Sequence, residues 1–586
     1  MGSSGAGKTT LLDVLAGRKT GGWITGNISL NGRPKDQKLW VRVSGYVEQL
    51  DVHSPGATVA EAVDFSAQLR LPQSTAPKQR SAYVRDILDL LELGPVARRL
   101  VGSIAEGGLS FEQRKRLTMA VEMAANPAVL FLDEPTSGLD SRAALVVVRA
   151  VANVAKTNRS VICTIHQPSA ALFLAFDRLL LLKKGGKMVY FGELGEDCAA
   201  LVAYLSDAAT SLGAGLPPLA EGQNPATWML TAAVDPDADF ADFYKFSPLA
   251  KANEADVLAA LEGSAPTRNP LLGGGLEAPL LDGDAPPPDA EPGPSMATEF
   301  LILSRKMAVT YWRSPAYNVA RLMVSVIVSV FFGSCYTEKI SDVNGALGRS
   351  GLLFVSTYFM GVIYMVTGMP LVAAERAAFY REQSSSMYRP LPYAMAYVLV
   401  EIPYLVVYSF IFCGVLFGIV DMYGGYEKFL WYVAIYMGYV SFMCFFGQFL
   451  VVALPDEASA QAIGPSVSSL FSLFSGFVIA PAKMPSFWMF MYWISPCHYF
   501  FEGLVVTQFH GVSKEVVVGA IPTPVGPVPV EVSLSTLLTG KGPFSKFNGE
   551  FLWEHRWTDL IFLFAMVAAL RILSTFFLAF VKYKTV

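Results

Sequence analysis

The sequence predicts two domains in succession: an α/β domain of the phosphate-loop (P-loop) ATPase class, then an all-α domain with six membrane-spanning helices. Three observations predict this order. The chain opens with Gly2-Ser-Ser-Gly-Ala-Gly-Lys-Thr9, which fits the pattern G-x-x-x-x-G-K-[ST] of loops that bind nucleotide phosphates. The composition is 53% hydrophobic and 16% charged, which is too apolar for a wholly soluble enzyme. The apolar residues concentrate after about residue 316, in six runs long enough to cross a bilayer.

The first element is the phosphate loop. Its glycines let backbone N–H groups converge on phosphate oxygens at the start of a predicted helix over 9–15, where the helix dipole favours anions. Lys8 would reach the β- and γ-phosphates, and the Thr9 hydroxyl would ligate Mg²⁺. The motif alone also fits a glycine-rich turn, so its assignment depends on the motifs that come later in the chain. The predicted nucleotide contacts of the loop are Gly2, Ser3, Gly5, Gly7, Lys8, Thr9 and Thr10.

The start of the chain is unusual for such a loop. A phosphate loop normally follows a buried β-strand, and only Met1 precedes it in this sequence. We therefore expect a nucleotide domain over 1–230 that is truncated at its N-terminus. Whether Met1 is the true start stays open.

Two adjacent carboxylates follow the next informative element. The short apolar run Val129–Leu132 predicts a buried strand, and it ends in Asp133 and Glu134. Asp133 can hold Mg²⁺ and Glu134 can polarise an attacking water, provided that the strand ends beside the phosphate loop. Taken alone, the pair is better explained as a solvated strand end.

Further motifs identify the kind of domain. The phosphate loop is followed in order by YVEQLDVHSP around Gln49, LSFEQRKRLTMAVE at 109–122, LFLDEPTSGLD at 130–140 and CTIHQPS at 163–169. This succession resembles the nucleotide-binding domain of ABC transporters, which implies ATP and Mg²⁺ as cofactors. The resemblance implies that Gln49 contacts Mg²⁺ and the attacking water. It also implies that His166 contacts the γ-phosphate and that Asp140 couples two nucleotide sites.

Two further sequence stretches narrow the resemblance to the G subfamily of ABC transporters. QLDVHSPGATVAEAVDFSAQLR and NPATWML at 224–230 resemble the pleiotropic-drug-resistance transporters, which carry two nucleotide domains and two membrane domains on one chain. This sequence is similar to their C-terminal half. The usual signature L-S-G-G-Q, which closes on ATP bound by the opposite half, reads Leu109-Ser110-Phe111-Glu112-Gln113 here. Ser110 is retained as a nucleotide contact, but a ring at Phe111 and a carboxylate at Glu112 disfavour close approach to a triphosphate.

The membrane domain is predicted over 298–586. Basic residues flank the first, second, third and last spans on one side, which places the nucleotide domain and the C-terminus in the cytosol. A mixed apolar and basic stretch, 297–315, predicts an amphipathic helix along the inner surface. The six expected spans lie near 316–335, 351–373, 394–420, 429–453, 458–480 and 557–581.

Several other segments carry expectations. The linker 231–297 should be disordered over 262–297, because it is rich in Pro, Gly and acidic residues and has little to bury. The stretch 373–390 is a candidate element for transmission between the domains, and its alternative is an ordinary basic flank. In 481–556 we expect short re-entrant helices and an external loop. Glu401 inside the third span favours a structural ion pair or polar relay over substrate contact.

The sequence thus favours ATP-driven export of amphipathic small molecules or lipids by one half of an ABC exporter, in a multi-pass protein of the plasma membrane. The substrate class and this membrane follow from the resemblance alone. A second ABC half, fused or separate, would complete the ATP sandwich. The alternatives are a truncated, non-transporting ATP-binding half and a homodimeric half-transporter. The net charge of −4 gives no reason to expect nucleic acid as a partner, and the six dispersed cysteines predict no disulfide framework.

Overall fold

The computed structural model divides into two compact units. The first comprises Met1–Thr298 and Arg381–Tyr388, and the second comprises Glu299–Tyr380 and Arg389–Val586. Within these bounds the structure describes residues 1–581, except for 20, 31–32, 103–106, 235–238, 263–292, 337–339, 341–342, 421, 524–525 and 540–550. The expected disorder over 262–297 lies outside the described residues over 263–292 and stays a prediction there, whereas residues 296–297 already belong to the helix Met296–Trp312, so the C-terminal end of the predicted range is wrong.

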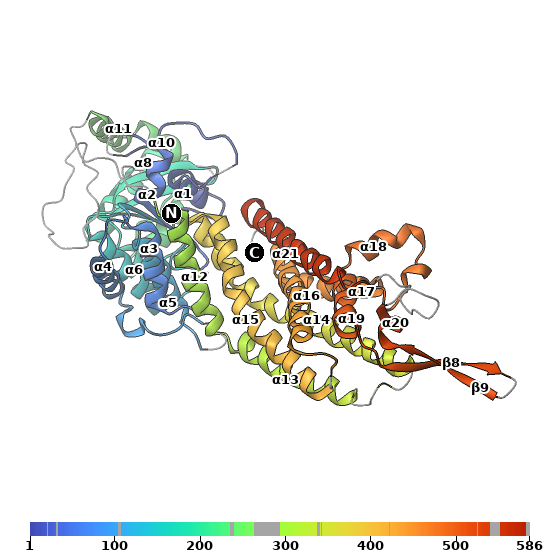
Figure 1. The fold of residues 1–586 in the computed structure, drawn as a ribbon. Helices are drawn as coiled ribbons and strands as arrows, with labels where there is room; N and C mark the ends of the chain where they lie inside the picture. Colours follow the sequence, from blue (N-terminus) through green and yellow to red (C-terminus); the bar gives the residue numbers. More distant parts are fainter. Residues whose placement is uncertain are drawn as a thin grey trace. The chain divides into compact units, whose positions relative to one another are not determined.

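The first unit is an α/β structure (Figure 1). Its strands are β1 (Ser29–Leu30), β2 (Arg33–Pro34), β3 (Ser44–Val47), β4 (Val129–Leu132), β5 (Ser160–Cys163), β6 (Arg178–Lys183) and β7 (Lys187–Glu193). Its helices are α1 (Lys8–Ala16), α2 (Gln37–Val43), α3 (Val59–Arg70), α4 (Pro77–Leu90), α5 (Phe111–Met123), α6 (Ser141–Ala155), α7 (Ala170–Phe173), α8 (Ala199–Leu212), α9 (Pro225–Val234), α10 (Phe240–Phe246) and α11 (Pro248–Leu261), with short 3₁₀ turns η1 (Gly94–Val96) and η2 (Glu196–Cys198).

A parallel three-stranded sheet in the order β3-β4-β5 positions the candidate site. The central strand β4 has the predicted bounds 129–132, and all four of its side chains are buried. Val129 and Phe131 pack with α1 and α2, whereas Leu130 faces Gly45 of β3, close to Glu122 of α5. Helices therefore cover both faces of β4, which explains why the strand reads as a continuous apolar run. Parallel strands end together, so the residues after β3, β4 and β5 gather at one edge of the sheet.

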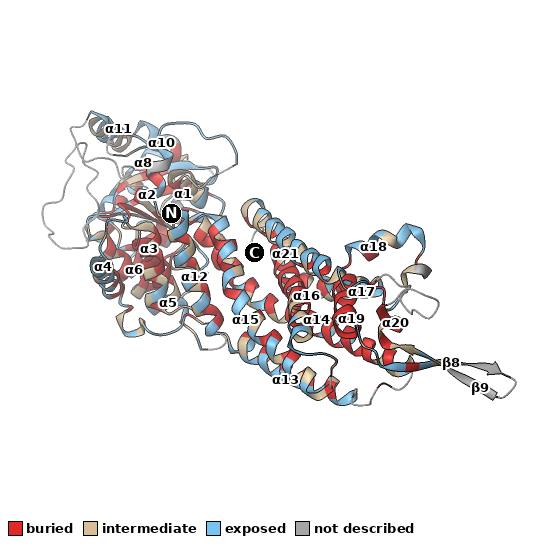
Figure 2. Ribbon diagram, viewed as in Figure 1, coloured by how far each residue is buried: buried red, intermediate tan, exposed pale blue. Residues whose placement is uncertain are grey.

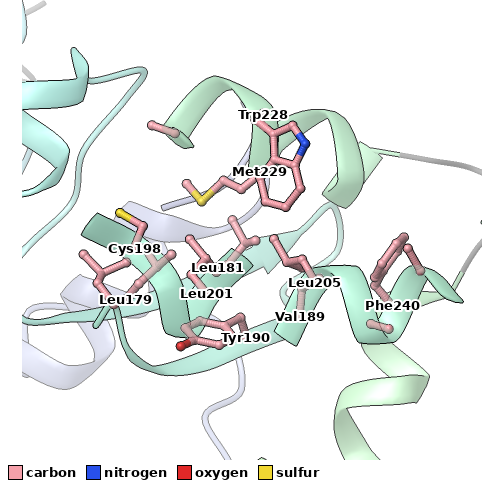
Figure 3. Packing of buried hydrophobic residues seen from close by; sticks show 14 of the residues in the cluster. Leu179, Leu181, Val189, Tyr190, Cys198, Leu201, Leu205, Trp228, Met229 and Phe240 are labelled. Atoms are coloured by element: carbon pink, nitrogen blue, oxygen red, sulfur yellow. The ribbon is translucent and has the colours of Figure 1, made fainter. Parts of the chain in front are cut away.

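A second core lies around the antiparallel pair β6–β7, against α8, α9 and α10 (Figure 3). Trp228 of the NPATWML stretch is 1% exposed in this core, and its indole N–H donates to the Pro217 carbonyl at 2.8 Å. The start of the chain joins the same part of the unit, because Gly2 forms a parallel bridge with Leu182 of β6. This core therefore supports the beginning of the phosphate loop.

The second unit is mainly helical (Figure 1). Among the described residues, five helices are long and apolar enough to cross a membrane: α13, α14, α15, α16 and α21. The helices are α12 (Met296–Trp312, which begins in the first unit), α13 (Pro315–Cys335), α14 (Val343–Ser384), α15 (Pro390–Val420), α16 (Tyr426–Ala453), α17 (Glu457–Leu473), α18 (Met489–Ile494), α19 (Pro496–Phe509), α20 (Leu534–Thr539) and α21 (His555–Phe580), with 3₁₀ turns η4 (Pro481–Lys483) and η5 (Ser486–Trp488). Strands β8 (Glu515–Thr523) and β9 (Gly526–Ser533) form a hairpin.

Helix α16 is the most enclosed of the five long helices (Figure 2). It packs closely on α14, where a Cβ added at Gly447 would lie 2.6 Å from the Met365 carbonyl oxygen. Small residues permit such close approach of helices in membranes. By contrast, α13 and α21 expose large apolar side chains, such as Ile327 and Ile572, of the kind that face lipid.

The structure differs from the sequence prediction at the fifth expected span, 458–480. Helix α17 ends at Leu473, so it has 17 residues and is not among the five long helices. Phe474 caps the C-terminus of α17, and the chain turns two residues later at Gly476, whose φ of +89° is left-handed. The prediction counted apolar residues through Ala480, and composition alone does not reveal this turn. The expected short helices beyond it are present as α18 and α19, and the proline-rich stretch of the expected loop forms the β8–β9 hairpin.

Two charged residues of the spans form a buried ion pair, which is one of the two structural roles expected for Glu401. Arg321 of α13 lies 2.8 Å from Glu401 of α15, and both side chains are 0% exposed. Tyr311 donates to the other Glu401 carboxylate oxygen at 2.9 Å, and Gln448 of α16 donates to the same oxygen at 3.1 Å. The carboxylate thus joins α12, α13, α15 and α16 through buried polar contacts.

Candidate functional site

The phosphate loop leads directly into α1. Gly5 and Gly7 have φ of +75° and +88°, a left-handed conformation that a side chain would strain. Lys8, the first residue of α1, folds back so that its ammonium donates to the carbonyls of Gly2 and Ser3 at 2.9 and 3.1 Å. A Cβ at Gly2 would lie 2.4 Å from the Leu182 carbonyl oxygen, so this position has no room for a side chain. The loop is therefore held compact at the N-terminus of a helix, where anions bind favourably.

The second part of the site joins α1 to the ends of β4 and β5. The Thr9 hydroxyl donates to Asp133 Oδ1 at 3.1 Å. The Thr164 hydroxyl donates to the same oxygen at 2.6 Å. Both Asp133 and Thr164 are buried, at 7% and 6% exposure. The carboxylate after β4 is thereby fixed beside the phosphate loop, which is the condition for its predicted role in holding Mg²⁺.

Glu134 is held on two sides. Its backbone N–H donates to Thr164 Oγ1 at 2.8 Å, and its side-chain Oε2 accepts from Gln49 Nε2 at 3.1 Å. Its φ of +45° is unusual for a residue with a side chain. Strain of this kind costs about 1–3 kcal/mol and persists where the surroundings determine the conformation. The structure therefore brings Gln49, Thr9, Asp133 and Glu134 into one connected cluster.

The other predicted site residues lie on the surface of the first unit. His166 is exposed on the loop after β5, and Asn224 supports this loop by donating to the Pro168 carbonyl at 2.8 Å. Asp140 caps α6, and its Oδ1 accepts from the Ala143 N–H at 2.8 Å. Thr10 is exposed on α1. Exposed side chains of this kind are available to a ligand or to a second protein surface.

The signature region forms the start of α5. Ser110 caps this helix, because its hydroxyl accepts from Gln113 N–H at 3.3 Å while Gln113 Oε1 accepts from Ser110 N–H at 3.2 Å. Phe111 is 60% exposed at the first helical position. Glu112 lies 3.7 Å from Arg116 on the next turn. The helix terminus that would meet a phosphate therefore presents a ring and a carboxylate.

Sequence reasoning missed two residues that organise this cluster. Thr164 stands between Asp133 and Glu134, and its position in CTIHQPS gave the only signal. Lys115 of α5 is 3% exposed, and its ammonium donates to the Gln49 carbonyl at 2.8 Å and the Glu48 carbonyl at 3.2 Å. A lysine inside EQRKRL reads as a solvated helix face, so its role in fixing the Gln49 backbone could not be inferred from the pattern.

The donor set fits a hard divalent cation. Thr9, Asp133 and Gln49 offer hydroxyl, carboxylate and amide oxygens beside the phosphate loop. Mg²⁺ prefers oxygen ligands and is usually held by one or two protein groups together with substrate phosphates. The residues present therefore suit Mg²⁺ together with a nucleoside triphosphate.

Comparisons with known proteins agree with this arrangement. A family model described as "ABC transporter" matches residues 1–137, and one described as "ABC-2 type transporter" matches residues 298–509. "ABC transporter G family member 40" of Arabidopsis thaliana is 38% identical over 525 residues, which cover 88% of this chain and 35% of that protein. "Pleiotropic drug resistance protein 1" of Nicotiana tabacum is 39% identical over 517 residues, which cover 87% and 35%. "ABC transporter G family member 34" of Oryza sativa subsp. japonica is 37% identical over 597 aligned residues, which cover 100% and 37%. The chain thus spans about a third of the length of these curated relatives.

Proposed function

We propose that this chain, which belongs to the ABC transporter family and has its relatives in the G branch, is one half of an ATP-driven exporter. The observation that carries the proposal is the single cluster in which Thr9, Asp133, Gln49 and Glu134 meet beside the phosphate loop. A nucleotide domain of this kind joined to a unit with long apolar helices suits the use of ATP to move a substrate across a membrane.

ATP would be bound by the loop amides and by Lys8, which exchanges its two carbonyl contacts for phosphate oxygens. Thr9, Asp133 and Gln49 would hold Mg²⁺, and when bound the ion neutralises charge that develops on the phosphoryl oxygens. Glu134, oriented by Gln49 and by its own bonded N–H, would accept a proton from the attacking water. His166 would contact the γ-phosphate from the loop after β5.

Transport would follow from closure of two nucleotide domains around ATP. The signature of a second half, fused or separate, would complete the site built on Lys8 and Glu134. Phe111 and Glu112 make this chain's own signature a poor partner for ATP in the opposite half, so one of the two sites would hydrolyse slowly. This asymmetry favours a heteromeric pair over a homodimer.

The substrate would be an amphipathic organic molecule or a lipid, and the membrane would be the plasma membrane. The nucleotide domain and the C-terminus would lie in the cytosol, since basic residues flank the spans on that side. The name of the tobacco relative refers to drug resistance, which accords with such substrates. The alternative is an ATP-binding half that does not transport.

The test uses the full chain together with its second half, purified in lipid, and compares Glu134→Gln with Glu254→Gln, an exposed glutamate on α11. Loss of the general base should lower ATP turnover by at least about 100-fold. Binding of a fluorescent ATP analogue should persist, because Lys8 and the loop are intact. Turnover of the Glu134 variant equal to that of the control would contradict the assignment. If no amphipathic compound changes the rate of ATP turnover, the non-transporting alternative is favoured.

A further inference from the structure

A buried histidine, His53, has no task in the hydrolysis just described. It lies four residues after Gln49 and is 8% exposed. Its Nδ1 is 2.8 Å from Arg381 Nη1, and its Nε2 is 2.9 Å from the Thr118 hydroxyl. Arg381 begins the segment Arg381–Tyr388, which belongs to the first unit although its first four residues form the C-terminal end of the long helix α14. Thr118 lies on α5, the helix that starts at the signature.

The chemistry of these groups fixes the direction of every hydrogen bond. A guanidinium only donates, so His53 Nδ1 must present its lone pair to Arg381. The imidazole proton then lies on Nε2 and is donated to the Thr118 oxygen. The Thr118 hydroxyl in turn donates to Asp51 Oδ1, 2.7 Å away. One neutral tautomer of His53 is therefore required for this arrangement.

The surroundings keep His53 neutral. Burial is the main cause that holds the pKa of His53 well below its ordinary value, and the neighbouring Arg381, Arg114 and Lys115 cations lower that pKa further. A protonated ring would have no lone pair for Arg381 and would place a second cation beside it. The contact thus tolerates only the uncharged ring at neutral pH.

This series of contacts ends at the Gln49 loop. Asp51 Oδ1 lies 3.1 Å from the Lys115 ammonium, which also donates to the Gln49 carbonyl at 2.8 Å. The Gln49 side chain bonds to Glu134. A continuous set of bonds therefore runs from Arg381 through His53, Thr118, Asp51 and Lys115 to the backbone of Gln49.

Two direct contacts hold the same segment nearby. The Ser384 hydroxyl donates to Glu48 at 2.8 Å, and the Ser385 hydroxyl donates to Glu122 of α5 at 3.0 Å. Glu122 is buried and paired with Arg70 at 2.9 Å. These contacts anchor the segment at separate points, whereas His53 joins it to the Gln49 loop and to α5 at one point.

We propose that His53 is a positioning residue that makes Arg381–Tyr388, the Gln49 loop and the signature helix α5 move as one body when ATP binds. This inference rests on the proposed ATP-driven transport and deepens it. A displacement of Arg381–Tyr388 would be transmitted through His53 to the backbone of Gln49, the residue that orients Glu134. In the opposite direction, a movement of the Gln49 loop on ATP binding would be transmitted to Arg381–Tyr388. His53 acts through these neighbouring groups and has no role of its own in the hydrolysis proposed above.

The first test measures transport per ATP hydrolysed in inside-out vesicles that contain the full chain together with its second half, with a rhodamine dye as the probe. His53→Leu removes both hydrogen bonds and should lower this ratio about tenfold or more, as expected for the loss of a buried bond to a charged group. His53→Gln should restore at least half of the ratio, because its amide oxygen accepts from Arg381 and its NH₂ donates to Thr118. A ratio for His53→Leu equal to that of wild type overturns the inference. Wild-type vesicles that neither hydrolyse ATP nor take up dye would contradict the proposed function instead.

The second test needs no transport and tolerates a misfolded leucine variant. In the Glu134→Gln background, ATP should slow hydrogen–deuterium exchange in residues 46–55 and 381–388 together. Thr118→Val, nearly the same shape as threonine, should leave the slowing at 46–55 and abolish it at 381–388, whereas Thr118→Ser should keep both. The inference is overturned if ATP still slows exchange at 381–388 in the Thr118→Val variant. It is also overturned if, in the Glu134→Gln parent, ATP slows exchange at 46–55 but not at 381–388. A parent in which neither segment responds to ATP contradicts both the inference and ATP binding.

Discussion

Thr164 offers the sharpest perturbation of the candidate site, because one hydroxyl serves both carboxylate residues. It donates to Asp133 Oδ1 at 2.6 Å and accepts from the Glu134 N–H at 2.8 Å. Thr164→Val keeps the shape of the side chain and removes both bonds. A hydrogen bond to a charged group contributes about 1.5–3 kcal/mol, and a neutral one contributes about 0.5–1.5 kcal/mol. If the transition state needs both, the barrier rises by about 2–4 kcal/mol, which lowers turnover about 30- to 1,000-fold.

The assay is steady-state ATP hydrolysis by the full chain together with its second half in lipid, over a range of ATP concentrations. The KM for ATP should change by less than about threefold, because the hydroxyl acts on carboxylates that matter in the transition state, and Lys8 with its loop is untouched. Thr164→Ser, which keeps the hydroxyl, should stay within about threefold of wild type in kcat. A valine variant that hydrolyses ATP as fast as the serine variant would refute this reasoning.

Three further predictions concern the signature, the membrane unit and pH. Replacing Phe111 and Glu112 by glycine should raise ATP turnover of the chain on its own at least about tenfold, because it removes the ring and the carboxylate that would lie near a triphosphate. Unchanged turnover would contradict the argument about the signature. Arg321→Met should destabilise the purified chain by about 3–5 kcal/mol, since it leaves a buried carboxylate unpaired, while Arg321→Met with Glu401→Leu should recover most of that loss in a thermal melt; equal losses would contradict the ion pair. The pKa of His53 is lower in the folded chain than its unfolded value of about 6.5, so below pH 6.5 the unfolded chain binds a proton that the folded chain does not. The free energy of unfolding of the wild type should therefore fall by up to about 1.4 kcal/mol per pH unit below pH 6.5. His53→Gln should lack this component, and identical pH profiles would count against a neutral buried ring.

Much of the site could be predicted because its residues occur in ordered motifs. The spacing of the phosphate loop predicts a helix at its end, and α1 begins at Lys8. The apolar run before Asp133 predicts β4 with its observed bounds. The structure also places Gln49 within hydrogen-bond distance of Glu134, although the roles predicted for both stay predictions. Local pattern sufficed here, because each residue acts at the end of a regular element.

Other features depend on contacts between segments far apart in the chain. Lys115 and Thr118 read as one turn of a charged helix, and only the fold shows that both are buried against the Gln49 loop. The end of α17 at Leu473 and the left-handed turn at Gly476 lie within a mostly apolar stretch, whose composition predicts a longer helix. The Arg381–His53 contact joins residues that lie 328 positions apart. Periodicity and composition carry no information on such pairings.

The most direct test of the central claim is ATP-dependent uptake of a rhodamine dye by inside-out vesicles that contain the chain together with its second half. We expect uptake with ATP and Mg²⁺, and background uptake with Glu134→Gln or with a non-hydrolysable ATP analogue. Uptake that continues at the wild-type rate in the Glu134→Gln variant would show that hydrolysis at this site does not drive transport.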